Sequence, residues 1–417
     1  MNYYFSDCDT VALAKEYGTP LYVMSEDIIL ERLNEIRHSF TEKYQDVQAY
    51  YASKAFLTKE MARIIKREGL GLDVVSGGEL YTAKSVDFPM EKIMFHGNNK
   101  TPEEIKMALE CKIGRFVCDS IWEIQLIDGL AKEMGVKADI LLRIAPGVDS
   151  HTHKYISTGN IDSKFGIPIP YVNEAVKLSL ESEGITLKGL HFHIGSQILE
   201  NESHIMAVEI MLNLIKKIKE EVGYVAQEFN LGGGFGIKYL DDTEKRKLSY
   251  FVDPMMNSIE EFCSNNGIRR PRIFIEPGRW VVGEAGITLY TIGSIKKIPG
   301  VRTYAGIDGG FPDNPRTALY QAKYEGIVAN KADLPKTERV TIAGKCCESG
   351  DILIWDLNVP ELQPGDILAV KSTGAYNYSM ASNYNRIPKP AVVMLSKGKP
   401  RLIVKRQTYE DMLRDEC

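Results

Sequence analysis

Apolar runs of strand length recur along the first two thirds of the chain, and each is followed by polar or glycine-rich residues. Runs of this kind, bounded by turn residues, are typical of buried strands. Eight of them stand out, at residues 47–52, 71–76, 92–97, 114–119, 139–146, 187–195, 228–234 and 272–278. We therefore predict eight buried strands.

Segments with apolar residues at helical spacing lie between most of these strands. Residues 101–112 start with threonine, proline and acidic residues, which favour a helix start. Residues 120–135 open with serine and end with glycine, and residues 203–223 carry lysines near their end. Eight strands alternating with helices predict a (β/α)₈ TIM barrel. A doubly wound sheet would need a glycine-rich turn after its first strand, and none follows residue 52.

The pattern changes beyond about residue 280. Short alternating stretches such as "ITLYTIGSI", "RVTIAGK" and "AVVMLSKG" are separated there by proline and glycine turns. This texture predicts a mostly antiparallel β domain, to which "PLYVMS" near the N-terminus can add a strand. The predicted domains are a barrel at residues 27–280 and a β domain made of residues 1–26 and 281–417.

The composition narrows the function classes. Apolar residues make up 44% and charged residues 26%, which is ordinary for a soluble globular protein. A net charge of -5 argues against a nucleic-acid surface, and no apolar run reaches the roughly 20 residues of a membrane span. The first residues, "MNYYFSDCDT", lack the basic and apolar regions of a signal peptide. Seven scattered cysteines fit free thiols in a reducing cytoplasm.

Titratable residues gather where the predicted barrel strands end. Barrel enzymes place their chemistry at the C-terminal ends of the strands. The side chains and glycines expected there are Lys54, Asp73, Ser76, His96, Arg143, His193, Ser196, Gly232 to Gly236, Glu276 and Arg279. Some polar residues would occur there by chance, but so many at one mouth favour an active site.

The glycines in "LGGGFG" follow the seventh strand, where this fold often holds a phosphate on backbone N–H groups. An ordinary flexible turn is the alternative. A phosphate site together with Lys54 indicates pyridoxal 5'-phosphate (PLP), which is held as a lysine Schiff base. Glu276 would then bond the pyridine nitrogen and make the ring a stronger electron sink. A simple ion pair between Glu276 and Arg279 is the alternative there, and for His193 it is a packing role.

Several segments, in order along nearly the whole chain, resemble one enzyme family. They are "YYASKAF", "LDVVSGGELYTA", "IMFHGNNKT", "HFHIGSQI", "NLGGGFGIKY", "IEPGR", "DNPRTALY", "GKCCESGD" and "GAYNYSMASNYNRIPKP". Together they are similar to the diaminopimelate decarboxylases. That family belongs to the fold-type III PLP decarboxylases, whose barrel is similar to that of alanine racemase.

The resemblance implies a set of cofactor-binding residues. Lys54 would be the Schiff-base lysine, Glu276 the partner of the pyridine nitrogen, and His193 would stack on the cofactor. The other cofactor-binding residues expected on this basis are Asp73, Ser196, Gly233, Gly234, Gly278, Arg279 and Tyr376. Among these, the phosphate would be served by Ser196, Gly234, Gly278 and Tyr376.

The resemblance also implies substrate-binding residues. Arg279, Arg316 and Tyr320 would bind a substrate carboxylate, with Tyr376 nearby, and Glu348 would meet a distal ammonium. The implied reaction is decarboxylation of meso-2,6-diaminopimelate to L-lysine and CO₂, the last step of lysine biosynthesis.

Catalysis is assigned by the resemblance to Lys54, His193 and Cys347, the last as proton donor. Cys346 is given no chemistry. In this family the donor cysteine and Glu348 reach the site from the partner subunit, so the expected assembly is a homodimer with shared active sites. No metal, nucleic acid or membrane is expected.

Some positions differ from the usual pattern of the family. Phe311 and Pro312 replace methionine and a small residue, and Thr317 stands where proline often follows the arginine. Asn377 replaces a glycine or other small residue, and Trp280 follows "EPGR" where a small residue is common. We expect any change in substrate shape to arise at these positions.

Three other functions are compatible with parts of this pattern. A PLP decarboxylase of lysine, ornithine or a carboxylated polyamine is the nearest, but relatives acting on basic amino acids tend to carry Asp where this chain has Glu348. A non-catalytic PLP-binding regulator would not need both Lys54 and Cys347. A metal-dependent barrel hydrolase could use His191 and His193 as ligands, but such enzymes place that pair on the first strand.

Overall fold

The computed structural model describes residues 1–148 and 163–417. The chain divides into two compact units. The barrel unit consists of Leu33–Gly236 and Arg246–Trp280, and the β unit consists of Met1–Arg32, Ile237–Lys245 and Val281–Cys417. The predicted boundary at residue 26 thus precedes the observed one at Arg32, and a short segment within the predicted barrel, 237–245, belongs to the β unit.

Eight parallel strands of the barrel unit form a closed ring, so the predicted TIM barrel is confirmed. Neighbouring strands follow chain order, β10 pairs with β8, and pairing of β12 with β4 closes the ring. The strands are β4 Val47–Ala52, β5 Gly71–Val74, β6 Ile93–Phe95, β7 Arg115–Cys118, β8 Ala138–Ala145, β10 Ile185–Phe192, β11 Glu228–Asn230 and β12 Arg272–Ile275. A two-residue strand, β9 Ile167–Pro168, adds to β8.

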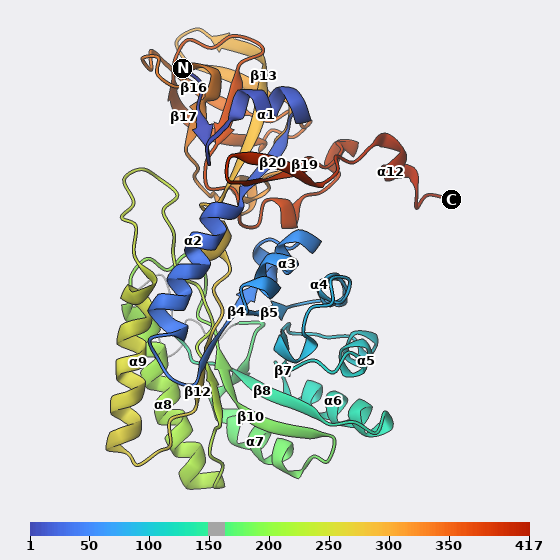
Figure 1. The fold of residues 1–417 in the computed structure, drawn as a ribbon, viewed down its shortest axis with the longest axis vertical. Helices are drawn as coiled ribbons and strands as arrows, with labels where there is room; N and C mark the ends of the chain where they lie inside the picture. The colour runs from blue at the N-terminus through green and yellow to red at the C-terminus, as the bar shows by residue number, and fades with distance from the viewer. Residues whose placement is uncertain (149–162) are drawn as a thin grey trace. The chain divides into compact units, whose positions relative to one another are not determined.

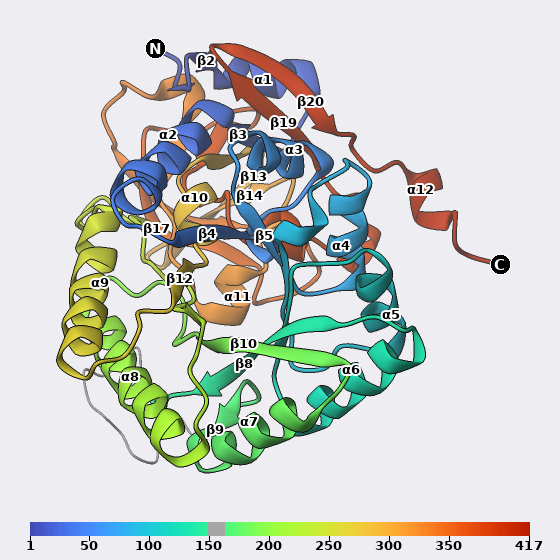
Figure 2. The same ribbon diagram turned by 60° about the horizontal axis from the view of Figure 1, so that its bottom comes forward.

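Helices form a ring outside these strands (Figure 2). The helices are α3 Lys59–Arg67, α4 Gly77–Lys84, α5 Pro102–Glu110, α6 Ile121–Glu133, α7 Val172–Glu181, α8 Glu202–Val222 and α9 Leu248–Asn265, with short turns η1 Arg37–Thr41, η2 Ser53–Ala55, η3 Met90–Lys92 and η4 Ile169–Tyr171. Local sequence explains their ends. Thr101 and Glu104 form a capping box at the start of α5, and Gly223 ends α8 with a φ of 78°.

The barrel interior is filled with side chains. Tyr50, Met94, Val117, Leu141 and Phe274, from five different strands, form one buried cluster. The rings of Tyr50 and Phe274 meet edge to face at 5.4 Å. Because the interior is packed, a ligand site must lie at an end of the barrel.

The β unit is built on a mixed, mainly antiparallel sheet in the order β17-β16-β14-β13-β3-β19-β20. Figure 1 labels five of these strands, β13, β16, β17, β19 and β20. Its strands are β3 Leu21–Ser25, β13 Gly286–Ile298, β14 Arg302–Ile307, β16 Glu338–Ala343, β17 Ile352–Val359, β19 Ala391–Ser396 and β20 Lys399–Val404. The N-terminal strand β3 lies between β13 and β19, so the prediction that "PLYVMS" completes this sheet is confirmed.

Smaller elements complete the β unit. Strands β15 Gly326–Val328 and β18 Ile367–Val370 pair with each other, β18 also pairs with β13, and β1 Tyr4–Phe5 pairs with β2 Cys8–Asp9. The helices are α1 Thr10–Tyr17, α11 Arg316–Tyr320 and α12 Tyr409–Leu413, with turns η5 Ala329–Lys331, η6 Tyr378–Met380 and η7 Tyr384–Arg386. Helices α2 Glu26–Ile36 and α10 Arg279–Val282 each contain a boundary between the units. No helix in the described part of the chain has the length and apolar character needed to cross a membrane.

Candidate active site

A cavity of about 590 Å³ lies where the barrel strands end. Its titratable lining comes from six strands or the turns directly after them: Lys54, Asp73, His96, Arg143, His191, His193 and Glu276. Parallel strands in a closed ring bring their C-terminal ends together, which explains how residues so far apart in sequence share one cavity. Of the residues expected at the strand ends, Lys54, Asp73, His96, Arg143, His193, Ser196 and Glu276 line it.

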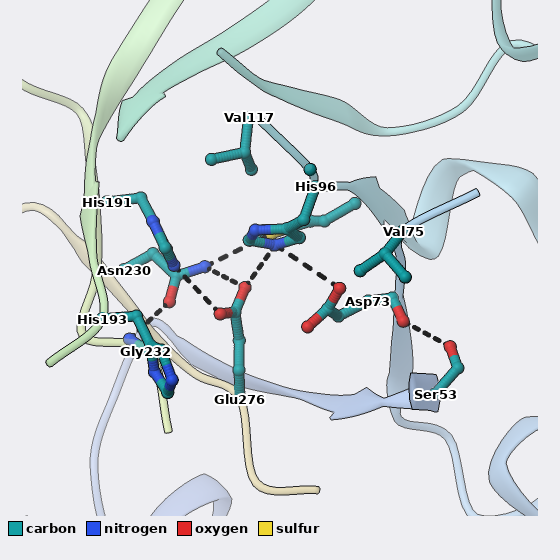
Figure 3. A network of polar contacts seen from close by, with 12 residues as sticks. Ser53, Asp73, Val75, His96, Val117, His191, His193, Asn230, Gly232 and Glu276 are labelled. Carbon is teal, nitrogen blue, oxygen red and sulfur yellow. Dashed lines mark hydrogen bonds and ion pairs between the residues drawn. The ribbon is translucent and has the colours of Figure 1, made fainter. Parts of the chain in front are cut away.

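Glu276 lies at the centre of the polar network in this cavity (Figure 3). The Asn230 amide donates to Glu276 Oε1 over 2.7 Å, and His191 Nε2 lies 3.0 Å from Oε2. His96 Nε2 lies 2.7 Å from Oε1. Asn230 also accepts a hydrogen bond from the Gly232 N–H at 2.9 Å, which ties the network to the glycine-rich turn.

These contacts keep Glu276 ionised. Burial alone would raise the pKa of Glu276, but its close contacts and hydrogen bonds with His96 and His191 hold that pKa well below its usual range. Burial lowers the pKa of His191 to about 4, so near neutral pH this imidazole is uncharged and its Nε2–H can donate to the carboxylate. The floor of the cavity therefore carries a buried anion with fixed donors around it.

Asp73 is the second buried carboxylate of the cavity. Its Oδ1 lies 3.9 Å from His96 Nε2, and its backbone oxygen accepts a hydrogen bond from the Ser53 hydroxyl. Burial raises the pKa of Asp73. Its Oδ1 has no hydrogen-bond partner among the residues that the structure describes, so this acceptor is available to a bound molecule.

Lys54 enters the cavity from the short turn η2, directly after β4. Burial and, after it, the charge of Lys54 lower the pKa of His193 well below its ordinary value. His193 is therefore neutral near neutral pH, and its Nδ1 accepts a hydrogen bond from the Gly233 N–H at 3.3 Å. An amine and a neutral imidazole thus face one cavity.

Two positions of the glycine-rich turn require glycine, because other backbone atoms lie too close to them for a side chain. A Cβ at Gly233 would lie 2.1 Å from the Glu276 carbonyl oxygen, and one at Gly234 would lie 2.3 Å from the Gly195 oxygen. Gly234 also has a φ of +96°, which favours glycine. The Gly233 N–H is taken by His193, so an anion at this turn would have to be bound by other groups.

Ser196 and Arg279 lie beside this turn and are joined to each other. The Arg279 guanidinium donates to Ser196 Oγ from Nη2 at 2.9 Å and from Nε at 3.3 Å. Gly278, next to Arg279, packs against the end of β4, since a Cβ there would lie 2.9 Å from Ala52 Cβ. A guanidinium and a glycine after the eighth strand, together with a hydroxyl after the sixth, form a site suited to an anion such as a phosphate or a carboxylate.

A buried ion pair joins the ends of β6 and β7. The side chains of Lys100 and Glu123 are only 1% and 2% exposed, and Lys100 Nζ lies 3.0 Å from Glu123 Oε1. Lys100 also donates to the carbonyl oxygens of Gly97 at 3.0 Å and Val117 at 2.8 Å. The Asp119 N–H donates to Glu123 Oε2 at 2.8 Å. The pair thus ties the loop after β6, which borders the cavity at Gly97 and Asn98, to the segment between β7 and α6.

The remaining predicted site residues belong to the β unit. Arg316 begins α11, and its Nη1 donates to the hydroxyls of Tyr324 at 2.8 Å and Tyr239 at 3.4 Å. The predicted residues Tyr320 and Tyr376 are close by, with ring centres each 5.9 Å from the guanidinium carbon. Arg316 therefore sits among aromatic rings, where its charge is partly shielded from water.

Cys347 and Glu348 are exposed on a loop of the β unit. The Cys347 N–H donates to Asn385 Oδ1 at 2.8 Å, and Glu348 Oε1 accepts from the Gly350 N–H at 3.1 Å. Cys346 is partly buried, and burial followed by the charge of Asp351 raises the pKa of its thiol to about 12. The two adjacent cysteines are therefore chemically different.

The structure shows the surroundings of four of the positions that depart from the family pattern. Trp280 and Asn377 are buried, and Phe311 packs on Tyr384 with ring centres 5.6 Å apart. Thr317 faces a second cavity of about 610 Å³ in the β unit.

Sequence reasoning missed several functional contacts. Asn230 ends the seventh strand, so the strand-end rule covers it, but the sequence shows it only as part of an apolar run. The sequence predicts His96 at a strand end but gives no partner for it. Tyr239 and Tyr324, which contact Arg316, follow no motif or spacing that would have pointed to them.

The barrel site suits PLP. It combines a lysine, a buried anion for a protonated ring nitrogen, an unsatisfied carboxylate oxygen and a guanidinium–hydroxyl pair suited to an anionic group. The metal alternative named His191 and His193. The described residues that could jointly hold an ion are instead His96, His191 and Glu276, with ligand atoms within 4.8 Å of one another.

Comparisons with known proteins agree with this geometry. Residues 28–283 match the sequence model of the family described as pyridoxal-dependent decarboxylase, pyridoxal binding domain. The chain is 50% identical over 408 residues to diaminopimelate decarboxylase of Bacillus subtilis, covering 97% of this chain and 93% of that protein. It is 49% identical over 401 residues to the Bacillus methanolicus enzyme, covering 96% and 93%.

Solved structures give the same result. Diaminopimelate decarboxylase from M. jannaschii in complex with L-lysine superposes with a TM-score of 0.94 at 37% identity, covering 100% of this chain and 96% of that one. The Helicobacter pylori enzyme complexed with L-lysine gives 0.88 at 31%, covering 97% and 98%. The chain therefore belongs to the pyridoxal-dependent decarboxylase family, among the diaminopimelate decarboxylases.

Proposed function

We propose that this protein decarboxylates meso-2,6-diaminopimelate to L-lysine and CO₂ with PLP as cofactor, in lysine biosynthesis. The observation that carries the proposal is the barrel cavity, where Lys54 and a buried, ionised Glu276 line one space. The names of the relatives at up to 50% identity over nearly the whole chain support the same reaction.

PLP, when bound, draws electrons away from the carbon that loses CO₂. The residues that would hold it are Lys54 at its aldehyde carbon and Glu276 at its ring nitrogen. Its phosphate would be held by Ser196, Gly234, Gly278 and Tyr376. Because Glu276 stays an anion, it can keep a proton on the ring nitrogen. His193 is neutral and can lie against the ring without repelling it.

Substrate recognition is assigned to the β unit and Arg279. Arg316 and Arg279 can each bind a carboxylate by paired hydrogen bonds, and Glu348 can accept hydrogen bonds from an ammonium. Diaminopimelate has both groups at its distal end, whereas lysine and ornithine lack the carboxylate. A site that leaves a guanidinium unpaired discriminates against such analogues by roughly 10⁴-fold.

The proton that replaces CO₂ is assigned to the Cys347 thiol. Its Sγ–H would give the proton to the α-carbon, and a later exchange with water would restore the thiol. Cys346 is a poor alternative, because its side chain is partly buried and its pKa is about 12.

The active unit is proposed to be a homodimer in the cytoplasm, with Cys347 and Glu348 completing the partner's site. Mixing Lys54→Ala with Cys347→Ala tests this sharing. Random reassortment would give heterodimers with one intact site, recovering at most about a quarter of wild-type activity. No recovery despite demonstrated subunit exchange would mean that each site is built within one chain.

The deciding experiment is a CO₂-release panel with PLP added. Meso-diaminopimelate should be the best substrate by kcat/KM, with L-lysine and L-ornithine far behind. If another amino acid is better, the substrate assignment is wrong although the decarboxylase assignment stands. If no amino acid releases CO₂, the decarboxylase assignment also fails.

A further inference from the structure

We infer that Asp351 and Asn385 are positioning residues, which fix the loop carrying Cys347 and Glu348 in place, and that Asp313 supports the same arrangement. The inference rests on the proposed function, because it concerns the proton donor and the ammonium acceptor of that reaction. Residues 344–351 are called the donor loop here, and residues 309–316, which lead into α11, are called the arginine loop.

Asp351 joins the two loops through both of its carboxylate oxygens. Its Oδ1 accepts a hydrogen bond from the Phe311 N–H in the arginine loop at 2.7 Å. Its Oδ2 accepts from the Cys346 N–H in the donor loop at 3.0 Å. Asp351 is 4% exposed, so these are bonds to a buried charge, and such bonds are stronger than bonds between neutral groups.

Two glycines allow this carboxylate to reach both backbones. A Cβ at Gly344 would lie 2.0 Å from Asp351 Oδ2, and one at Gly310 would lie 2.5 Å from the same atom. Gly310 also has a φ of +146°. The backbone adds a direct link, because the Lys345 N–H donates to the Gly309 oxygen at 2.9 Å. The loops are therefore held at one spacing by a buried charge and by the backbone.

Asp313 fixes the arginine loop from its other side. Its Oδ2 accepts from the Gly310 N–H at 2.9 Å, and its Oδ1 accepts from the Tyr290 hydroxyl. Tyr22 donates to its backbone oxygen at 2.6 Å. Asp313 precedes Arg316, the first residue of α11, by three residues, so its carboxylate anchors the segment that leads into this helix.

Asn385 holds the donor residue itself. Its Oδ1 accepts the Cys347 N–H at 2.8 Å, while the adjacent Cys346 N–H is held by Asp351. The consecutive N–H groups of Cys346 and Cys347 are thus held by two different side chains. A thiol that must deliver a proton to one carbon depends on such placement, because a 1 Å displacement can cost on the order of 100-fold in rate.

The first test replaces Asp351 by Asn, which keeps the size but puts an amide N–H against one of the two backbone donors. In the full-length holoenzyme, kcat for meso-diaminopimelate should fall on the order of 100-fold, while the dissociation constant of PLP and its visible spectrum stay unchanged. Alkylation of Cys346 by iodoacetamide, followed by peptide mass spectrometry, should become faster. Removing the charge of Asp351 lowers the pKa of that thiol.

Asp366→Asn is the matched control. Asp366 is also 4% exposed, lies in the same unit and accepts a backbone N–H, that of Gln363, at 2.7 Å, but it contacts neither loop. Its replacement should leave kcat and Cys346 alkylation at wild-type values. If Asp351→Asn retains wild-type kcat, or if Asp366→Asn loses as much, the positioning role of Asp351 is wrong.

Asn385 supplies a second test that does not depend on a buried charge, since this residue is exposed. Asn385 has a φ of +51°, so Asn385→Gly removes the acceptor without straining the backbone, and Asn385→Asp retains it. We expect Gly to lower kcat about tenfold and Asp to restore it. Equal activities in the two variants would overturn the role of Asn385. An inactive wild-type protein would instead overturn the proposed function.

Discussion

The two units of the protein hold their functional groups in opposite ways. In the barrel unit the side chains meet one another, as Glu276 meets His96 and His191, because eight strand ends converge on one cavity. In the β unit the residues lie on loops, and carboxylates such as Asp351 bind backbone N–H groups to hold them. Strand register fixes the first arrangement, whereas the second depends on a few buried charges. This difference predicts that the barrel governs the cofactor and the β unit governs the substrate.

The largest expected effect comes from Lys54. Lys54→Ala should lower turnover by on the order of 10⁴-fold or more, as loss of a catalytic nucleophile does elsewhere. Borohydride should fix a pyridoxyl group on Lys54 in the wild type, and mass spectrometry of the variant should find none. Lys59→Ala, which removes an exposed lysine at the start of α3, is the control and should behave as the wild type. An adduct on another lysine would contradict the assignment of the cofactor to this strand end.

A smaller loss, and a different one, is expected from Arg316→Ala. It should lower kcat/KM for meso-diaminopimelate by about 10² to 10³-fold, since truncating one member of a buried charged contact costs 2–5 kcal/mol or more. The PLP dissociation constant should stay at the wild-type value. Arg302→Ala removes an arginine of the same unit that pairs with Asp356, and should leave both quantities unchanged. Weaker PLP binding in Arg316→Ala would contradict the prediction that the barrel unit governs the cofactor and the β unit governs the substrate.

Lys100→Met tests how much the buried ion pair beside the barrel site contributes to the stability of the fold. Removing one member of the buried Lys100–Glu123 pair leaves an unpaired charge, which should lower the free energy of unfolding by about 3–5 kcal/mol. Urea unfolding followed by circular dichroism measures this change. Lys106→Met is the control, because Lys106 pairs with Glu133 at the surface. Comparable losses in the two variants would mean that the burial of the first pair has no energetic consequence.

The smallest effect concerns pH. His204 in α8 is buried against Phe235, and burial lowers its pKa to about 4 from an ordinary value of 6.5. Because the unfolded chain binds this proton more readily, the stability from neutral His204 is full above about pH 6.5 and falls as pH drops towards 4. Between pH 7 and pH 4, the free energy of unfolding of His204→Phe should therefore fall by ~3 kcal/mol less than that of the wild type.

Urea titrations at several pH values check this expectation, with His38→Gln as an exposed control. The control should reproduce the wild-type dependence on pH. If His204→Phe does so as well, another buried group dominates the acid response.

The contrast between the units also explains what the sequence could predict. The strands and their ends were readable because apolar runs mark buried strands, and a closed parallel barrel brings Lys54, His193 and Glu276 to one place. The β sheet was readable from its short alternating stretches. The segment 237–245 was not assigned to the β unit, because no change in composition marks its two boundaries.

Contacts between side chains and backbone leave no pattern in the sequence comparable to the apolar runs that mark strands. Asp351 was visible only as the last letter of a motif, and its two N–H partners are 5 and 40 residues away along the chain. Asp313 is followed by an asparagine and a proline and reads as an ordinary turn residue. Such contacts require the paths of both loops, which periodicity does not give.

The close approach of Gly310 and Gly344 to Asp351 has a consequence for mutational tolerance. No side chain fits at either glycine without displacing the carboxylate, so random changes there should be eliminated in any selection for activity. Phe311 and Thr317 lie in or next to the arginine loop, but their side chains face other groups. The Phe311 ring packs on Tyr384, and Thr317 lines the second cavity. A library aimed at altered substrate choice can therefore vary these two positions freely and leave the glycines untouched, with most members still able to fold.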